Sequence, residues 1–135
     1  MQFKVKDWMV DVIVFVDPDI TVTHALELMR RRYIHSLIVN KTKDNPEFGI
    51  VTSTDISDKI IARELNPSNV KVREIMNSPL ITIPQDWSLK DCALKMKEKR
   101  IHHLPVVDDG GELVGMISDT DFLAAAEALS HNPAV

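Results

Sequence analysis

The chain carries nearly the same sequence twice. Three blocks recur in the same order at an offset of 66 or 67 residues: 5–9 with 72–76, 33–37 with 100–104, and 49–55 with 115–121. The one-residue difference in offset falls in a loop, where an insertion costs little. Such ordered repetition indicates an internal duplication, and a tandem duplication predicts two equivalent half-structures with two equivalent clefts.

Composition narrows the class of protein. With 135 residues, 44% hydrophobic and 27% charged, the chain is typical of a globular protein with one domain or two half-domains. It has no apolar run near the ~18 residues that span a bilayer, and its N-terminus does not resemble a signal peptide. A net charge of −4 argues against a general nucleic-acid binder. A single cysteine, Cys92, forms no internal disulfide, so we expect a reducing compartment and a cytoplasmic protein.

The first copy predicts the order strand, helix, strand, strand, helix. Residues 10–16 are almost all apolar and β-branched, which is typical of a buried strand. Thr21 is placed to cap a helix that runs to about Arg32. Short strands are expected at 36–39 and 48–52. A second helix is expected from about Thr54 to just before Asn66.

The second copy follows the same plan. It predicts a strand at 80–83, a helix capped by Ser88 with Asp91 in the capping-box position, strands at 104–107 and 112–118, and a last helix at 122–129. The expected class is α/β (α+β). The expected organisation is one repeat at 1–66, a second at 67–130 and a tail at 131–135.

The sharpest chemical signal is a hydroxyl residue followed three positions later by an aspartate. It occurs as Thr52 with Asp55 and as Ser118 with Asp121, each after a glycine-led strand and at a helix start. Free N–H groups at a helix N-terminus attract phosphate, and a carboxylate there can accept hydrogen bonds from ribose hydroxyls. The alternative is simple helix capping, because Ser, Thr and Asp are the usual caps. Two copies in matched contexts favour a ligand.

Histidines follow the basic ends of the first helix of each copy. His35 follows three arginines, and His102 and His103 follow Lys99 and Arg100. Cations at helix C-termini usually face solvent, but a histidine here could also contact a phosphate. Adjacent residues on a strand point to opposite faces, so His102 and His103 are poor joint metal ligands and we expect no metal site.

No arrangement of residues in the chain predicts catalysis. Cys92 corresponds to Ala25 in the other copy, so we expect a buried, inert thiol rather than a nucleophile. Trp8 and Trp87 are expected to serve packing. The sequence has no serine–histidine–acid order, phosphate-binding glycine loop or paired-cysteine motif, and we expect the protein not to be an enzyme and to require no cofactor.

Taken together, these blocks resemble a tandem pair of cystathionine-β-synthase (CBS) domains, also called a Bateman module. The resemblance covers about residues 4–129 and rests most clearly on 72–76, 101–108 and 115–121. It implies a βαββα unit in each half, with the two halves packed around a pseudo-twofold axis. In this family, adenosine nucleotides or S-adenosylmethionine bind in one or both clefts between the halves.

The resemblance also implies roles for particular residues. The aspartate holds ribose, the hydroxyl residue lies near ribose or phosphate, residues at the start of the second strand lie near phosphate, and the opposite repeat supplies backbone contacts to adenine. One cleft would then use Ser118, Asp121, His102, His103, Val14 and Ile34, and the other Thr52, Asp55, His35, Ser36, Ile81 and Ile101.

The first copy departs from the family pattern at two positions. Ile38 stands where the second copy has Pro105, and Ser36 stands where it has His103. Loss of that cation removes a charge-assisted phosphate contact, worth about 1.5–3 kcal/mol. We therefore expect the cleft of Asp121 to bind phosphorylated ligands better than the cleft of Asp55.

The resemblance predicts a non-enzymatic regulatory module. It would sense an adenosyl ligand (AMP, ADP, ATP or S-adenosylmethionine), as in energy sensing, and signal to a partner protein. A homodimer is expected, with Phe122, Leu123, Ile60 and Ile61 as contributors if they are exposed. The alternatives are a constitutive dimerisation scaffold with vestigial sites and, less favoured by the charge, a nucleic-acid-binding module.

Overall fold

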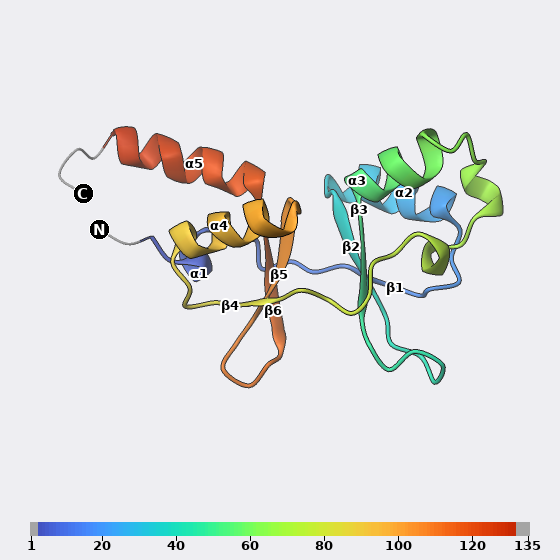
Figure 1. Cartoon of the computed structure of the whole chain (residues 1–135), viewed down its shortest axis with the longest axis horizontal. Helices are drawn as coiled ribbons and strands as arrows, with labels where there is room; N and C mark the ends of the chain where they lie inside the picture. The colour runs from blue at the N-terminus through green and yellow to red at the C-terminus, as the bar shows by residue number, and fades with distance from the viewer. Residues whose placement is uncertain (1–2, 132–135) are drawn as a thin grey trace. The chain divides into compact units, whose positions relative to one another are not determined.

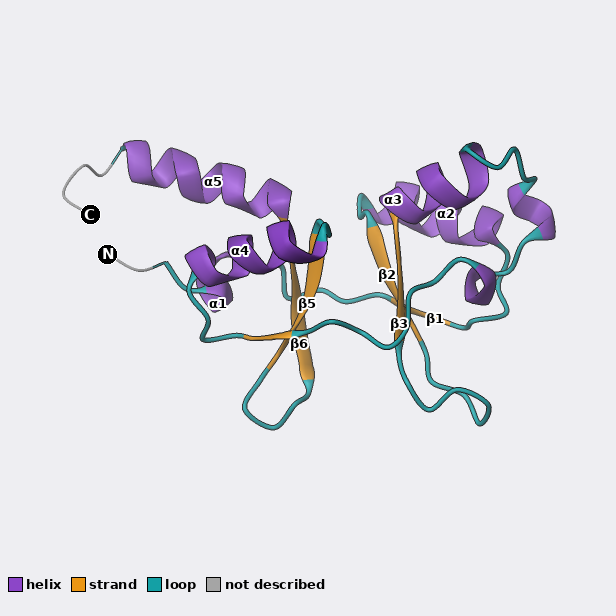
Figure 2. Ribbon diagram, viewed as in Figure 1, coloured by secondary structure: helices purple, strands orange, loops and turns teal. Residues whose placement is uncertain are grey.

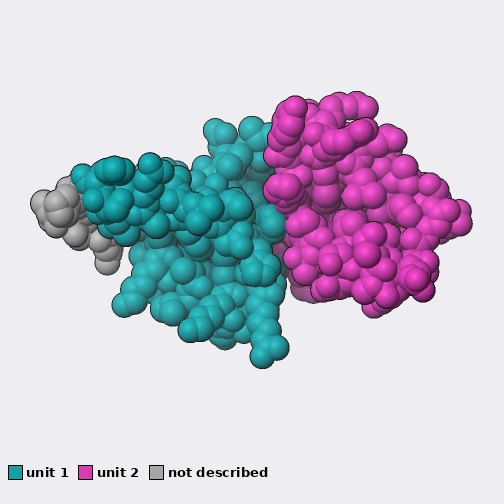
Figure 3. All heavy atoms as spheres, turned by 90° about the horizontal axis from the view of Figure 1, so that it is seen from above, with its two compact units in different colours: residues 1–13, 81–135 teal, residues 14–80 magenta. Residues whose placement is uncertain are grey.

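The computed structural model describes residues 3–131, which divide into two compact units (Figure 3). Among the described residues, unit 1 comprises 3–13 and 81–131, and unit 2 comprises Val14–Leu80. The units therefore differ from the sequence repeats in one respect. The segment before the first strand of each copy belongs to the unit built by the other copy. The expected tail at 131–135 lies, apart from His131, outside the described residues.

Unit 2 is a three-stranded sheet with helices (Figures 1 and 2). Strand β1 (Phe15–Val16) pairs in parallel with β2 (Ser36–Val39), and β2 pairs antiparallel with β3 (Gly49–Thr52). Its helical elements are, in chain order, α2 (Val22–Arg32), α3 (Ser53–Ile56), the π-helical turn η1 (Ser57–Ile61), and the 3-10 turns η2 (Pro67–Asn69) and η3 (Val72–Glu74).

Unit 1 repeats this plan. Strand β4 (Ile83–Pro84) is parallel to β5 (His103–Val107), which is antiparallel to β6 (Leu113–Ser118). Its helices are α1 (Val5–Trp8), α4 (Leu89–Lys99) and α5 (Asp119–Ser130). The mixed α/β class is confirmed, as are the predicted helix caps: Thr21 Oγ1 accepts from His24 N, and Ser88 Oγ from Asp91 N, each at 3.1 Å. None of the described helices is long and apolar enough to span a membrane.

The first strand of each copy is shorter than predicted. Of residues 10–16, only Phe15 and Val16 form a strand, and Val10 and Val12 are 47% and 52% exposed. The physical reason is that this run is divided between the two units at Ile13 and Val14, so one half cannot continue the other's pairing. In the second copy the strand is Ile83–Pro84 rather than 80–83. The helix predicted to start at Phe122 starts at Asp119.

Each unit has its own hydrophobic core. In unit 2 the core joins the inner face of α2 to the sheet through Val22, Ala25, Leu37 and Val51, all with no exposed surface. In unit 1, α4 packs on the sheet through Cys92 and Met96. The two tryptophans lie at the edge of the unit 1 core, as predicted.

The segments that precede the first strand of each copy, residues 3–13 and 67–80, are called the exchanged segments, and equivalent contacts hold them in their units. In unit 1, Val5 N donates to Trp87 O at 2.8 Å and Lys6 pairs with Asp86 at 3.0 Å. In unit 2 the corresponding contacts join Val72 N to Ile20 O at 2.9 Å and Arg73 to Asp19; all eight residues match at an offset of 67. The hydrogen bond and charge of Lys6 lower the pKa of the Asp86 carboxyl.

Candidate functional site

The two hydroxyl–aspartate motifs lie where the last strand of each sheet passes into a helix. Thr52 ends β3 and Asp55 lies in α3, while Ser118 ends β6 and Asp121 lies in α5. The antiparallel register pairs Ser36 with Thr52 and His103 with Ser118. Within each unit, the structure therefore brings the predicted hydroxyl, carboxylate and second-strand residues to one end of the sheet.

In unit 1, one oxygen of Asp121 caps its own helix. Oδ2 accepts from Ser118 N at 2.8 Å and from Ser118 Oγ at 3.4 Å, and Ser118 Oγ lies 2.7 Å from Thr120 Oγ1. Across residues 3–131, no hydrogen bond or ion pair reaches Oδ1. The Asp121 side chain is half-buried. In Asp121, one carboxylate oxygen therefore caps the helix while the other remains available to accept a hydrogen bond.

The histidines of unit 1 flank this motif. His102 is exposed, and its Nδ1 lies 3.1 Å from Asp119 Oδ2, while Asp119 N donates to His102 O at 3.1 Å. His103 is half-buried at the start of β5. The His102–Asp119 pair is exposed and therefore weak. An anion near His102 would have to compete with the Asp119 carboxylate.

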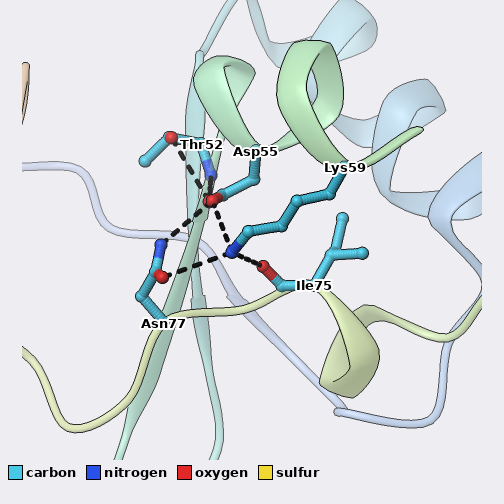
Figure 4. Close-up of polar contacts among 5 residues, drawn as sticks. All are labelled: Thr52, Asp55, Lys59, Ile75 and Asn77. Atoms are coloured by element: carbon cyan, nitrogen blue, oxygen red, sulfur yellow. Dashed lines mark hydrogen bonds and ion pairs between the residues drawn. The ribbon is translucent and has the colours of Figure 1, made fainter. Parts of the chain in front are cut away.

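In unit 2, the corresponding aspartate is fully engaged (Figure 4). Asp55 is 5% exposed. Its Oδ2 accepts from Thr52 N at 2.9 Å and from Thr52 Oγ1 at 3.3 Å. Its Oδ1 accepts from Asn77 Nδ2 at 3.0 Å and lies 3.0 Å from Lys59 Nζ. Both oxygens therefore have partners within the unit, which leaves little capacity for a ligand.

Sequence reasoning missed Lys59 and Asn77, although the repeat contains the signal. Ala125 occupies the position of Lys59 in the second copy, and Val10 occupies that of Asn77. The backbone supports this alignment: Asn77 bridges to Ile50 in unit 2 as Val10 bridges to Met116 in unit 1. An alignment of the two copies outside the repeated motifs shows that only the Asp55 motif has a cation and an amide at these two positions.

The remaining predicted contacts are distributed over both units. Val14 and Ile34 are half-buried against the unit 2 core, and Ile101 is half-buried against the unit 1 core. His35 is exposed, and its carbonyl oxygen accepts from Ser53 N at 3.0 Å. These positions belong to the opposite unit or to the Asp55 motif, so their ligand roles stay predictions.

One backbone difference distinguishes Ile81 from Val14. Ile38 N donates to Val14 O at 2.9 Å, whereas Pro105, at the position equivalent to Ile38, has no N–H to offer Ile81. Ile81 is 39% exposed. The carbonyl oxygen of Ile81 therefore lacks the strand hydrogen bond that occupies its counterpart.

Cys92 is buried, as predicted. It has no exposed surface, and burial, together with the charge of Asp121, raises the pKa of its thiol to about 11. A thiol in that state is a weak nucleophile. Within residues 3–131, no group of three His, Cys, Asp or Glu side chains is arranged to hold a metal ion.

The side chains predicted for a dimer interface differ in exposure. Leu123 and Ile61 are 71% and 69% exposed, but Ile60 is 1% exposed and belongs to the unit 2 core. Ile60 is thus unavailable to a partner because it faces inward from η1. A groove of about 430 Å³ lies between α4 and α5, lined by residues that include Phe3, Phe122 and Leu129.

The CBS domain family matches the sequence twice, at residues 5–62 and 72–128. Among curated proteins, an uncharacterized protein of Methanopyrus kandleri is 35% identical over 106 residues, which cover 78% of this chain and 54% of that protein. The chain thus spans about half the length of this relative.

Two solved structures are similar over nearly the whole chain. A hexameric CBS-CP12 protein from bloom-forming cyanobacteria has a TM-score of 0.86 at 29% identity, covering 96% of this chain and 75% of its own. A CBS domain pair in complex with 5′-methylthioadenosine and S-adenosyl-L-methionine has a TM-score of 0.78 at 26% identity, covering 95% and 98%.

Proposed function

The chain belongs to the CBS domain family, with two copies in tandem, and we propose that it is a non-enzymatic regulatory module for an adenosyl ligand. The ligand would be AMP, ADP, ATP or S-adenosylmethionine. The observation that carries the proposal is the Asp121 motif, where one carboxylate oxygen caps the helix and the described residues leave the other without a partner.

The chemistry of Asp121 suits a ribose. A carboxylate oxygen that accepts hydrogen bonds can hold a vicinal diol, as in dinucleotide-binding folds. Ser118 supplies a hydroxyl group beside it. The N-terminus of α5 attracts anions, and the carboxylates of Asp119 and Asp121 in its first turn reduce that attraction. The similar CBS pair in complex with two adenosyl compounds supports the same ligand class.

His102 and His103 are proposed to select among adenosyl ligands. His103 starts β5 and pairs with Ser118 in the register, and His102, one residue earlier, contacts Asp119. Protonated imidazole would favour phosphates over the uncharged tail of 5′-methylthioadenosine. Asp119 opposes this preference, so a sulfonium-bearing ligand such as S-adenosylmethionine would gain from the same site.

A thermal-melt panel with AMP, ADP, ATP, S-adenosylmethionine and NADH tests the proposal. A ligand at a hundred times its dissociation constant adds about 2.7 kcal/mol to the free energy of unfolding, which raises the midpoint by several degrees. Asp121→Asn is the matched variant, because its amide oxygen can still cap Ser118 N. We expect it to lose the shift and keep the unliganded midpoint within a few degrees.

A flat response of the wild type to all five compounds would instead favour a constitutive scaffold. Self-association is part of either account, and the exposed Leu123 and Ile61 are the side chains proposed to support a homodimer. The similar CBS-CP12 protein is hexameric, which supports self-association. In the sensor account, a partner protein reads a ligand-dependent arrangement, which requires that the ligand bind two states with different affinity.

A further inference from the structure

We propose that Asp55 is not a ribose ligand but the anchor of a structural clasp, formed by Lys59, Asn77 and the carbonyl group of Ile75, that closes the unit 2 motif to adenosyl ligands. This inference rests on the proposed function only in its statement about ligands. The clasp itself consists of contacts within unit 2 (Figure 4).

The clasp uses every hydrogen-bonding group that a ribose would need. Oδ1 of Asp55 accepts a hydrogen bond from Asn77 Nδ2 and forms an ion pair with Lys59 Nζ, each at 3.0 Å. The equivalent oxygen of Asp121 has no partner among the described residues. The Lys59 ammonium group also donates to Ile75 O at 2.8 Å and to Asn77 Oδ1 at 3.3 Å. An ammonium group has three protons, and here three acceptors surround it.

Burial makes the clasp hard to open. The side chains of Asp55 and Lys59 are 6% and 24% exposed. A ribose that displaced Lys59 would leave an ammonium group without its carboxylate, and breaking a buried pair is strongly unfavourable. Lys59 lies four residues after Asp55 on the same helical stretch, so the backbone itself holds the two side chains close together.

Unit 1 has no counterpart of the clasp at the equivalent positions. Ala125, 4% exposed, replaces Lys59, and Val10 replaces Asn77. The bridges of Asn77 to Ile50 and of Val10 to Met116 are equivalent. Lys59 lies in the π-helical turn η1 and Ala125 in the α-helix α5, so the two copies differ both in side chains and in local helix geometry. The inequality of the two motifs therefore has a second cause besides Ser36: in unit 2 the protein supplies its own cation and amide to the carboxylate.

The clasp also has a structural task. Ile75 and Asn77 belong to the exchanged segment that joins unit 2 from the second copy, and Lys59 reaches both. Asp55 and Lys59 thereby fasten that segment to the end of β3. We infer that a single adenosyl ligand binds per chain, at Asp121, while Asp55 contributes stability.

A double-mutant cycle in the unliganded protein tests the clasp directly. Asp55→Asn, Lys59→Met and the double variant are compared by urea unfolding. We expect a coupling of at least fivefold in the unfolding equilibrium constant.

Asp58→Asn with Lys59→Met is the control cycle, because Asp58 is exposed on the same turn, and its coupling should be below twofold. If Asp55→Asn does not fold, Asn77→Ala replaces it in the cycle. Coupling no larger than in the control would overturn the clasp.

The ligand statement is tested on the same variants with the compound that most stabilises the wild type. Asp55→Asn should bind it within twofold of the wild-type affinity. A tenfold loss in Asp55→Asn, with Asp121→Asn unaffected, would overturn the inference and leave the proposed function standing. If no compound binds the wild type, the proposed function fails, and the unfolding cycle still decides whether the clasp exists.

Discussion

Val10 and Met116 exchange two backbone hydrogen bonds, with Met116 N donating to Val10 O at 2.8 Å and Val10 N donating to Met116 O at 2.9 Å. This bridge attaches a segment near the N-terminus to strand β6, more than a hundred residues later. Because Ser118 and Asp121 follow directly on β6, the segment helps to fix the strand that presents the candidate site.

Gly115 is required by this attachment. A Cβ at position 115 would lie 2.8 Å from Val10 O and 2.7 Å from Met9 Sδ, so Gly115→Ala must push backbone away. We expect it to lower the free energy of unfolding by about 1–3 kcal/mol, as overpacking does. In Gly49→Ala the nearest backbone atom, Asn77 O, lies 3.3 Å away and the closer contact is the flexible end of Met76.

Gly49→Ala should therefore cost less than Gly115→Ala, and urea unfolding of both variants measures the difference. Equal losses, or a larger loss at Gly49, would contradict this account of the bridge.

Removal of residues 1–9 should weaken unit 1 specifically. The deletion takes away Val5, which has no exposed surface, and the ion pair of Lys6 with Asp86. Hydrogen exchange should then accelerate at least tenfold at β6 amides, while β2 amides in unit 2 change less. Val72→Ala is the control, because Val72 is the buried residue of unit 2 that corresponds to Val5. It should accelerate exchange more at β2 amides than at β6 amides. Uniform acceleration in both units after the deletion would argue against two separately packed cores.

Cys92 should be unreactive in the folded protein. Its thiol is buried with a pKa raised from 9.0 to about 11, so a maleimide reagent at pH 8 should label it only after unfolding. The raised pKa also predicts a pH dependence. Its contribution to stability is complete below pH 9 and is lost as pH rises toward 11, because the unfolded thiol ionises first.

Cys92→Ala is the matched variant, since Ala25 fills the equivalent position in unit 2. It should remove this alkaline loss. Rapid labelling of the native wild-type protein at pH 8 would show that the thiol is accessible after all.

The sequence was sufficient for the features that depend on local signals. Thr21 and Ser88 cap the predicted helices, and β2 begins and ends at the predicted residues. The strand predicted at 10–16 is wrong over 10–14, because an apolar β-branched run has the same local pattern whether one unit or two share it. The exchange of segments depends on contacts far apart in the chain, which no local pattern encodes.

The structure brings part of the predicted site together within each unit, and the ligand roles of those residues stay predictions. The register brings His103 to Ser118 and Ser36 to Thr52, as repeated motifs suggested. The state of each aspartate was not predictable from its motif, because Asn77 lies 22 positions from Asp55 and meets it only through folding. The mismatch of Lys59 with Ala125 was visible in the sequence, but its meaning depended on the geometry.

The central claim is that the two copies are unequal and that only the Asp121 motif binds an adenosyl ligand. Isothermal titration of the wild-type protein, with the compound that most raises its melting temperature, tests this most directly. We expect a stoichiometry of one ligand per chain, no binding to Asp121→Asn, and unchanged binding to Asp55→Asn. Two equivalent sites per chain, or binding that survives Asp121→Asn and disappears in Asp55→Asn, would contradict the account.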